Sequence, residues 1–144
     1  MNDILQDSLQ KVHEKLSKFS DISLDEFLAI SSIVRIEKIN AGEFFIQPGD
    51  SALKVAFTLQ GLAKTYYILD NDKELISHFG IEGSFLGVYT DMLKKVPSTG
   101  YIEAVEPCTL LTMNYQEMLN VTKDKIAWAH LLRTFAAKSD LAIS

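Results

Sequence analysis

The middle of the chain consists of eight short runs rich in β-branched and aromatic residues, and this pattern constrains the fold more than any other feature. The runs follow one another at intervals of roughly ten positions, a spacing typical of an all-β sandwich or roll. Most of the intervening turns contain Gly, Pro or an Asx side chain, which close tight turns. We predict strands at residues 34–39, 43–47, 54–59, 62–69, 73–79, 84–87, 100–105 and 109–113.

Helical patterns flank the predicted strands. Apolar residues recur at three- and four-residue steps over residues 4–19, and Ser23 with Glu26 forms a capping box that opens a second helix through about residue 32. After the strands, Asn114 begins a further helix, and Asp124 caps a last one that runs through about residue 137. We therefore expect one mainly β domain with flanking helices: a helical lead at residues 1–33, a β-roll at 34–113 and C-terminal helices at 114–144.

The last predicted helix is apolar on two sides, and only one of them can face the β-roll. One side carries Trp128, Leu131 and Phe135. The neighbouring side carries Ile126, Ala129, Leu132, Arg133 and Ala136. An apolar strip left in water marks an interaction site, so we expect a two-fold homodimer in which the second sides of two such helices pack together.

Composition excludes several classes of protein. The net charge of −5 argues against a nucleic-acid surface spread over this segment, because such surfaces concentrate Lys and Arg. A single cysteine, Cys108, forms neither an internal disulfide, nor a Cys-rich zinc site, nor an iron–sulfur cluster. The first residues do not read as a signal peptide and no apolar run is long enough to span a membrane, so we expect a cytoplasmic protein without a membrane partner.

The sequence gives no pattern for catalysis. The three histidines, His13, His78 and His130, lie in different predicted elements, and no His-Xaa-His pair is present. No Gly-Xaa-Ser-Xaa-Gly elbow is present either, and Cys108 falls at the start of a strand where a buried, inert thiol is the usual outcome. We expect no catalytic residues, no metal, no cofactor and no enzymatic activity.

Three motifs resemble one known family. They are the segment at 41–50, which ends in Pro48-Gly49-Asp50, the strand pair at 59–67 around Gly61, and the segment at 81–87, which ends in Phe85-Leu86-Gly87. With the helical lead and the long last helix, these resemble the cyclic-nucleotide-binding effector domain of Crp/Fnr transcription regulators. The resemblance implies a double-stranded β-helix, or jelly-roll-like β-roll, a C-terminal dimerisation helix and a ligand-sensing function. In that family DNA is bound by a downstream helix-turn-helix, which this chain does not contain.

The ligand cassette departs from the family pattern. The resemblance implies a Glu after Gly87, which takes the ribose 2′-hydroxyl, and an Arg some ten residues later, which neutralises the cyclic phosphate. Here the two positions hold Val88 and Ser98. Burying a phosphate without a cation costs several kcal/mol, so we expect no tight site for cyclic AMP. Candidate ligand-binding residues are Phe85, Leu86, Gly87, Val88, Tyr89, Ser98, Thr99 and Gly100.

Several alternatives stay open at this stage. Tyr89, Ser98 and Thr99 either bind a small-molecule effector or satisfy backbone groups in a degenerate cassette, and Lys94 and Lys95 either offer a cation or are solvated. The chain is thus either a ligand-controlled effector domain or a stand-alone interaction and dimerisation module with a decayed pocket. An enzyme of cupin-like architecture would need a metal triad that the sequence does not show.

Overall fold

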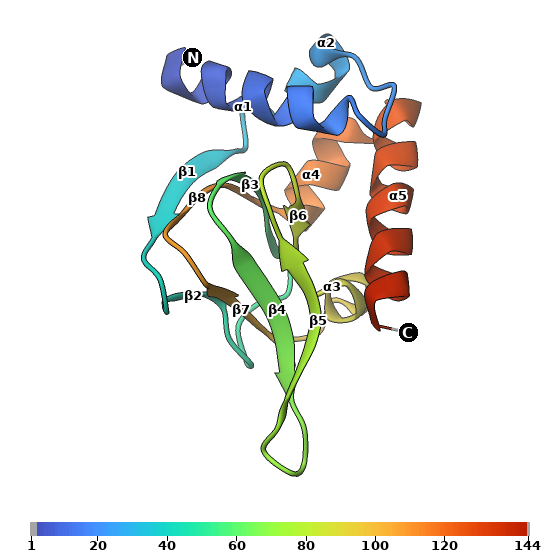
Figure 1. Ribbon diagram of the computed structural model, residues 1–144. Coiled ribbons are helices and arrows are strands. Elements are labelled where there is room, and N and C mark those ends of the chain that lie inside the picture. Colours follow the sequence, from blue (N-terminus) through green and yellow to red (C-terminus); the bar gives the residue numbers. More distant parts are fainter. Residues whose placement is uncertain (1–2, 144) are drawn as a thin grey trace.

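The computed structural model describes the backbone of residues 3–143 and the side chains of residues 3–137 (Figure 1). The helices are α1 (Asp3–Leu16), α2 (Leu24–Phe27), the 3-10 turn η1 (Leu28–Ile30), α3 (Tyr89–Lys94), α4 (Tyr115–Thr122) and α5 (Ile126–Ile143). The strands are β1 (Arg35–Ile39), β2 (Phe44–Ile46), β3 (Lys54–Gln60), β4 (Ala63–Ile68), β5 (Glu74–Gly80), β6 (Phe85–Leu86), β7 (Tyr101–Ala104) and β8 (Cys108–Asn114).

The strands form two antiparallel four-stranded sheets, with the orders β1-β8-β3-β6 and β2-β7-β4-β5. Successive strands mostly alternate between the two sheets, which is how a chain winds into a roll. α1 and α5 lie outside the roll, across one end and along one side of it (Figure 1). The expected fold class, mainly β with flanking helices and a long last helix, is confirmed.

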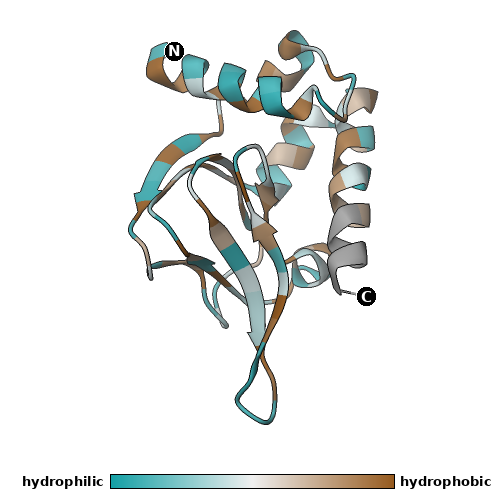
Figure 2. Ribbon diagram, viewed as in Figure 1, coloured by the Kyte–Doolittle hydropathy of each residue, from teal (hydrophilic) through white to brown (hydrophobic). Residues whose placement is uncertain are grey.

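Strands β3, β6 and β8 of the first sheet are buried on both faces, whereas the edge strand β1 is mostly exposed. Between the two sheets lies a roll core that includes Phe45, Leu86, Val88 and Ile102. Between this sheet and the helices lies a helical core, whose largest members include Phe27, Phe57, Trp128 and Phe135. Hydrophilic and hydrophobic residues accordingly alternate along α1, as expected for a helix with one buried side (Figure 2).

The helix boundaries differ from the predictions at several ends. The capping box is confirmed: the N–H of Glu26 donates to Ser23 Oγ and the N–H of Ser23 donates to Glu26 Oε1, both over 3.0 Å. The helix that follows is only four residues long and continues as η1. The first helix ends at Leu16 rather than residue 19, while α5 extends to Ile143, beyond the expected residue 137.

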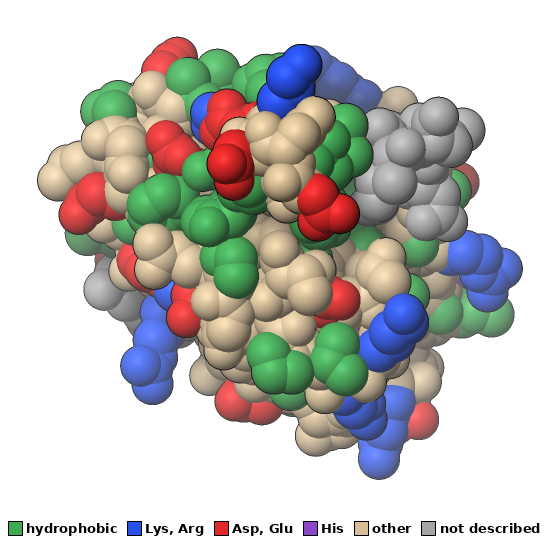
Figure 3. Space-filling view, turned by 90° about the horizontal axis from the view of Figure 1, so that it is seen from below, with side chains coloured by type: hydrophobic (Ala, Val, Ile, Leu, Met, Phe, Trp, Pro, Cys, Tyr) green, Lys and Arg blue, Asp and Glu red, His purple; other side chains and the backbone are tan. Residues whose placement is uncertain are grey.

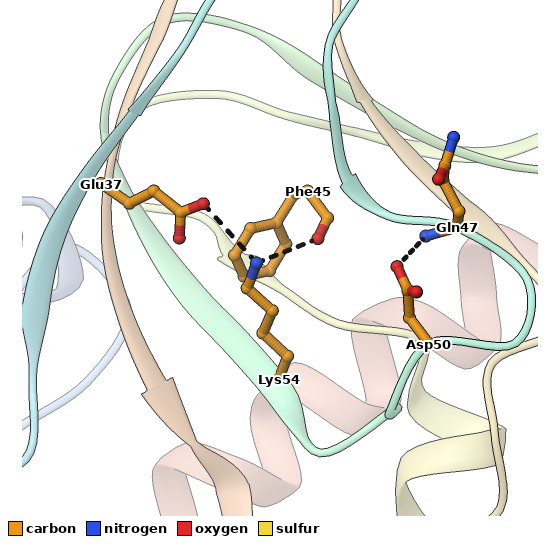
Figure 4. A network of polar contacts seen from close by, with 5 residues as sticks. All are labelled: Glu37, Phe45, Gln47, Asp50 and Lys54. Atoms are coloured by element: carbon orange, nitrogen blue, oxygen red, sulfur yellow. Dashed lines mark hydrogen bonds and ion pairs between the residues drawn. The ribbon is translucent and has the colours of Figure 1, made fainter.

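The turn after β2 holds the segment that leads into β7. Gly49 has a positive φ of 95°, which favours glycine, and the Asp50 carboxylate closes the turn by accepting a 2.8 Å hydrogen bond from the N–H of Gln47 (Figure 4). On its other side the turn forms two backbone hydrogen bonds to Ser98, each of 2.8 Å, through the Gly49 N–H and the Asp50 carbonyl. The Pro-Gly-Asp motif therefore positions the cassette segment.

Lys54 ties three strands together at the open edge of the roll. Its ammonium donates to the carbonyl of Phe45 over 3.3 Å, lies 4.5 Å from the centre of the Phe45 ring and pairs with Glu37 at 3.5 Å (Figure 4). Glu37, Phe45 and Lys54 belong to β1, β2 and β3 respectively. The network links the two sheets where backbone pairing does not.

The last helix divides into a buried and an outer side, as its sequence predicts. Trp128, Leu131 and Phe135 are buried in the helical core, and the Trp128 indole N–H donates to the carbonyl of Glu26 over 2.8 Å. Residues on the predicted dimer side differ in how far they are exposed to solvent. Ile126 (73% exposed), Ala129 and Arg133 face solvent, but Leu132 and Ala136 are half-buried because they also pack against the helical core.

Candidate functional site

The candidate cassette is the segment from Gly87 to Gly100, which joins β6 to β7. It contains the short helix α3, which is not among the predicted helices. The helix ends at Lys94, and the following residue, Lys95, adopts the left-handed conformation with φ of 57°. The side chains of Lys94 and Lys95 are exposed, and acidic, basic and hydrophobic side chains are interspersed over the face seen in Figure 3.

Val88 stands where the family has the ribose-binding acid, and its side chain is 1% exposed within the roll core. Leu86, two residues earlier, belongs to the same core. Gly87 lies between them, where a Cβ would come within 3.2 Å of Val55. The start of the cassette is therefore filled by apolar side chains.

Ser98 and Gly100 satisfy each other's polar groups. The Ser98 hydroxyl donates to the carbonyl of Gly100 over 2.9 Å, and the N–H of Gly100 donates to Ser98 Oγ over 3.1 Å. A side chain at Gly100 would lie 2.9 Å from the ring of Tyr67, so this close approach requires glycine. The position that the family fills with arginine is thus a buried serine engaged in a local turn.

The carboxylate of Asp91 takes both donors of Thr99. Its Oδ2 atom accepts hydrogen bonds from the backbone N–H and the hydroxyl of Thr99, each over 2.8 Å. Asp91 is on α3 and is only 7% exposed, and no basic side chain of the described residues pairs with it. The cassette therefore contains its own buried anion, held by two strong donors.

This buried carboxylate makes the cassette electrostatically unfavourable for a second anion. Burial, and to a smaller extent the charge of Asp91, raises the pKa of Tyr67, whose ring lies against Gly100. Sequence reasoning missed Asp91, because the family resemblance directs attention to the positions of Val88 and Ser98. The sequence contains an Asp eight residues before a Thr, but this spacing predicts no contact unless helix α3 is also predicted.

Tyr66 and Tyr67 point to opposite sides of β4, as the alternation of a strand predicts. Tyr67 packs against the roll core, whereas Tyr66 stacks on Tyr101 with ring centres 4.9 Å apart. The Tyr66 hydroxyl donates to Glu103 over 2.6 Å, and burial together with this carboxylate raises the pKa of Tyr66. Only Tyr67 adjoins the cassette.

The structure divides the eight predicted ligand-binding residues between two places. Leu86, Val88 and the turn at 98–100 adjoin the roll side of the β6 segment. Phe85 and Tyr89 belong instead to the helical core, where Phe85 stacks on Phe135 with ring centres 4.9 Å apart. Phe85 and Tyr89 therefore pack on the helical side of the sheet, and the assignment of all eight residues to one ligand site stays a prediction.

The histidines and the cysteine lie apart from one another. His13 Nε2 is 2.7 Å from the carbonyl of Ile22, and burial lowers the pKa of the half-buried His78. Cys108 is buried as expected, and burial raises the pKa of its thiol. Within the described residues, no three His, Cys, Asp or Glu side chains are placed to hold a metal ion, and no helix is long and apolar enough to cross a membrane.

Comparison with known proteins identifies a matching family and several solved structures of the same fold. The family model for the cyclic nucleotide-binding domain matches residues 36–125. No curated protein matches the chain in sequence.

Among solved structures, the sensor domain of the transcriptional regulator DNR from Pseudomonas aeruginosa superposes with a TM-score of 0.73 at 16% identity, covering 92% of this chain and 89% of that one. A cyclic nucleotide-binding domain from Methylobacillus flagellatus gives 0.71 at 16% identity, over 93% and 81% of the two chains. The Thermus thermophilus catabolite activator protein gives 0.71 at 19% identity, over 83% of this chain and 56% of that one. At these identities the structures share a fold with this chain.

Proposed function

The chain belongs to the cyclic nucleotide-binding domain family, and from this membership we propose that it is a non-catalytic, ligand-sensing effector domain of a Crp/Fnr-type transcription regulator. The shared fold with a regulator's sensor domain and with a catabolite activator protein supports this role. Because the chain spans 56% of the latter, DNA binding would belong to a further segment. Its effector would be a small molecule.

We propose that the cassette does not bind cyclic AMP or cyclic GMP tightly. The observation that carries this proposal is the pair of hydrogen bonds from Thr99 to Asp91, which occupy donors in the turn where the family binds phosphate. A phosphate about 5 Å from this carboxylate would be repelled by roughly 3 kcal/mol at an effective dielectric of about 20. Val88 and Ser98 supply neither the acid nor the cation that would offset this cost.

A homodimer through α5 is part of the same proposal. The exposed side chains of Ile126, Ala129 and Arg133 lie along the outer side of the helix. The small side chain of Ala129 would permit two helices to approach closely. Movement of this helix is the means by which a bound effector would be read by the rest of a regulator.

A second candidate function is a stand-alone interaction and dimerisation module. The filling of the cassette by Leu86 and Val88, both almost completely buried, favours it. The two functions differ in one respect that can be measured: an effector domain binds a small molecule, and a decayed module binds none.

Titration calorimetry with cyclic AMP tests the cassette proposal. We expect no saturable binding by the wild-type chain up to about 1 mM nucleotide, an affinity limit near −4 kcal/mol. The variant Val88→Glu/Ser98→Arg/Asp91→Asn restores the acid and the cation and removes the buried charge, and it should bind measurably. Asp91→Asn alone keeps the acceptor for Thr99 and serves as the folded control. Binding by the wild-type chain at micromolar or tighter affinity would contradict the proposal.

A further inference from the structure

A second hollow lies outside the roll, on the helical side of the molecule. It is a cavity of about 350 Å³ lined by residues of α1 and the turn after it, β5, the segment 81–85, the first turn of α3, and α5. In Figure 1, α5 runs beside β5 and α3 at this place. Its volume is within the range of cavities that hold small molecules.

The floor and one wall of this cavity are aromatic. Phe85 and Phe135 are buried and stack with ring centres 4.9 Å apart and an interplanar angle of 5°. Phe19 meets Phe135 edge-on at 6.1 Å, and the more exposed Phe79 and Ile81 also line the cavity. Such walls bind the flat or aliphatic body of an organic molecule.

Tyr89 also lines the cavity, with its hydroxyl oxygen enclosed behind the cavity wall. Its side chain is 7% exposed, and its hydroxyl oxygen is buried without a hydrogen-bond partner in the structure as described. Burial raises the pKa of this hydroxyl, which keeps it protonated and able to donate. Thr58 and Thr65 also have buried hydroxyls without a partner, but of the three only Tyr89 lines this cavity, so a ligand that displaces the side chains covering its hydroxyl would give it a partner.

Two lysines give the cavity a positive charge. Lys15 and Lys18 both line it. Lys15 is 3.8 Å from the carboxylate of Glu82, whereas Lys18 forms no ion pair within the described residues. One positive charge is therefore left over beside an aromatic floor, which favours an anionic group on the occupant.

We propose that this cavity binds a small organic anion with an apolar body, such as an aromatic carboxylate, whose carboxylate pairs with Lys18 and whose body lies on Phe85 and Phe135. Once the side chains that cover the Tyr89 hydroxyl move aside, a polar group on the body accepts its hydrogen bond. The role of this site rests on the proposed sensing function. The inference adds the chemical class of the effector. Because Phe135 is on α5 and Phe79 is on β5, the occupant contacts both the roll and the helix that would report its presence.

Fluorescence titration with 6-hydroxy-2-naphthoate tests the site, with 2-naphthoate and 2-naphthol as matched probes that lack the hydroxyl or the carboxylate. We expect saturable binding of 6-hydroxy-2-naphthoate by the wild-type chain. Lys18→Met should weaken both carboxylates about 5-fold and leave 2-naphthol unchanged. Tyr89→Phe should weaken 6-hydroxy-2-naphthoate about 5-fold and leave 2-naphthoate unchanged. Lys73→Met, at an exposed lysine in the β4–β5 turn, should change nothing.

Equal affinities across these variants, or no binding by a folded wild-type chain at about 1 mM probe, would overturn the inference. Occupation of the cavity by a second copy of the chain would appear as binding that falls as protein concentration rises, and it would also overturn it. Neither outcome bears on cyclic AMP, so failure here is distinguishable from failure of the cassette proposal.

Discussion

Strands β3, β6 and β8 are buried on both faces, and the cassette on the roll side differs from the cavity on the helical side in how its hydroxyl groups are satisfied. On the roll side, the cassette donors of Thr99 and the hydroxyl of Ser98 are bound within the protein. On the helical side, the hydroxyl of Tyr89 is buried without a partner beside a cavity. On our two proposals, a single carboxylate closes the ligand position of the family, and a ligand binds on the opposite face instead.

A substitution on the outer side of α5 should have the largest effect, because it would prevent a second protomer from packing against this helix. Ala129→Glu would place like charges across the two-fold axis and weaken association by a few kcal/mol. Sedimentation velocity at tens of micromolar should show a dimer for the wild-type chain and a monomer for this variant. Ala41→Glu, at an exposed alanine in the turn before β2, is the control.

Leu132 is a poorer position for the same test because it is half-buried in the helical core of its own protomer. A wild-type monomer, or a dimer indifferent to Ala129→Glu, would show that the helical face is not covered by a second copy.

Removal of the Asp91 carboxylate should destabilise the roll side next most strongly. Asp91→Ala breaks both hydrogen bonds from Thr99 and leaves its N–H without this acceptor, at a cost of about 1–3 kcal/mol. Urea unfolding followed by circular dichroism measures the loss. Thr90→Ala, at an exposed position of the same helix, should change stability by less than about 0.5 kcal/mol. If Asp91→Ala is as stable as the wild type, the carboxylate does not hold the cassette.

The smallest expected effect is a pH dependence of the free energy of unfolding, which arises on the helical side from His78. Burial lowers the pKa of His78 below its ordinary value of 6.5, so the unfolded chain binds this proton more readily than the folded chain. The contribution of neutral His78 to stability is therefore present above pH 6.5 and is lost as pH falls through that value towards the folded pKa. Urea midpoints measured across this range should fall less steeply in His78→Gln. Identical slopes would contradict the assignment.

The strands and helix caps could be predicted from sequence because each depends on the types and spacing of residues that are close together in the chain. Alternating β-branched and aromatic runs marked all eight strands within a few residues, and the reciprocal hydrogen bonds of Ser23 and Glu26 were predicted from their spacing alone. The short helix α3 was missed because its six residues include too few turns for a helical period to show.

The candidate site was harder to predict because it depends on contacts between elements. The bond between Asp91 and Thr99 exists only once α3 has formed, and the cavity needs α1, β5, α3 and α5 together. Phe85 and Tyr89 are among the predicted ligand-binding residues, yet the alternation of a strand places Phe85 on the face opposite Leu86. The assignment of all eight residues to one ligand site stays a prediction.

Amide chemical shifts of the isotope-labelled wild-type chain, titrated separately with cyclic AMP and with 6-hydroxy-2-naphthoate, test the contrast between the two faces most directly. Cyclic AMP should leave the amides of Thr99 and Gly100 unshifted, because Asp91 already accepts from Thr99 and Ser98 already accepts from the N–H of Gly100. The naphthoate should shift the amides around Lys18, Tyr89 and Phe135. Shifts at Thr99 and Gly100 that saturate with micromolar cyclic AMP would contradict the account.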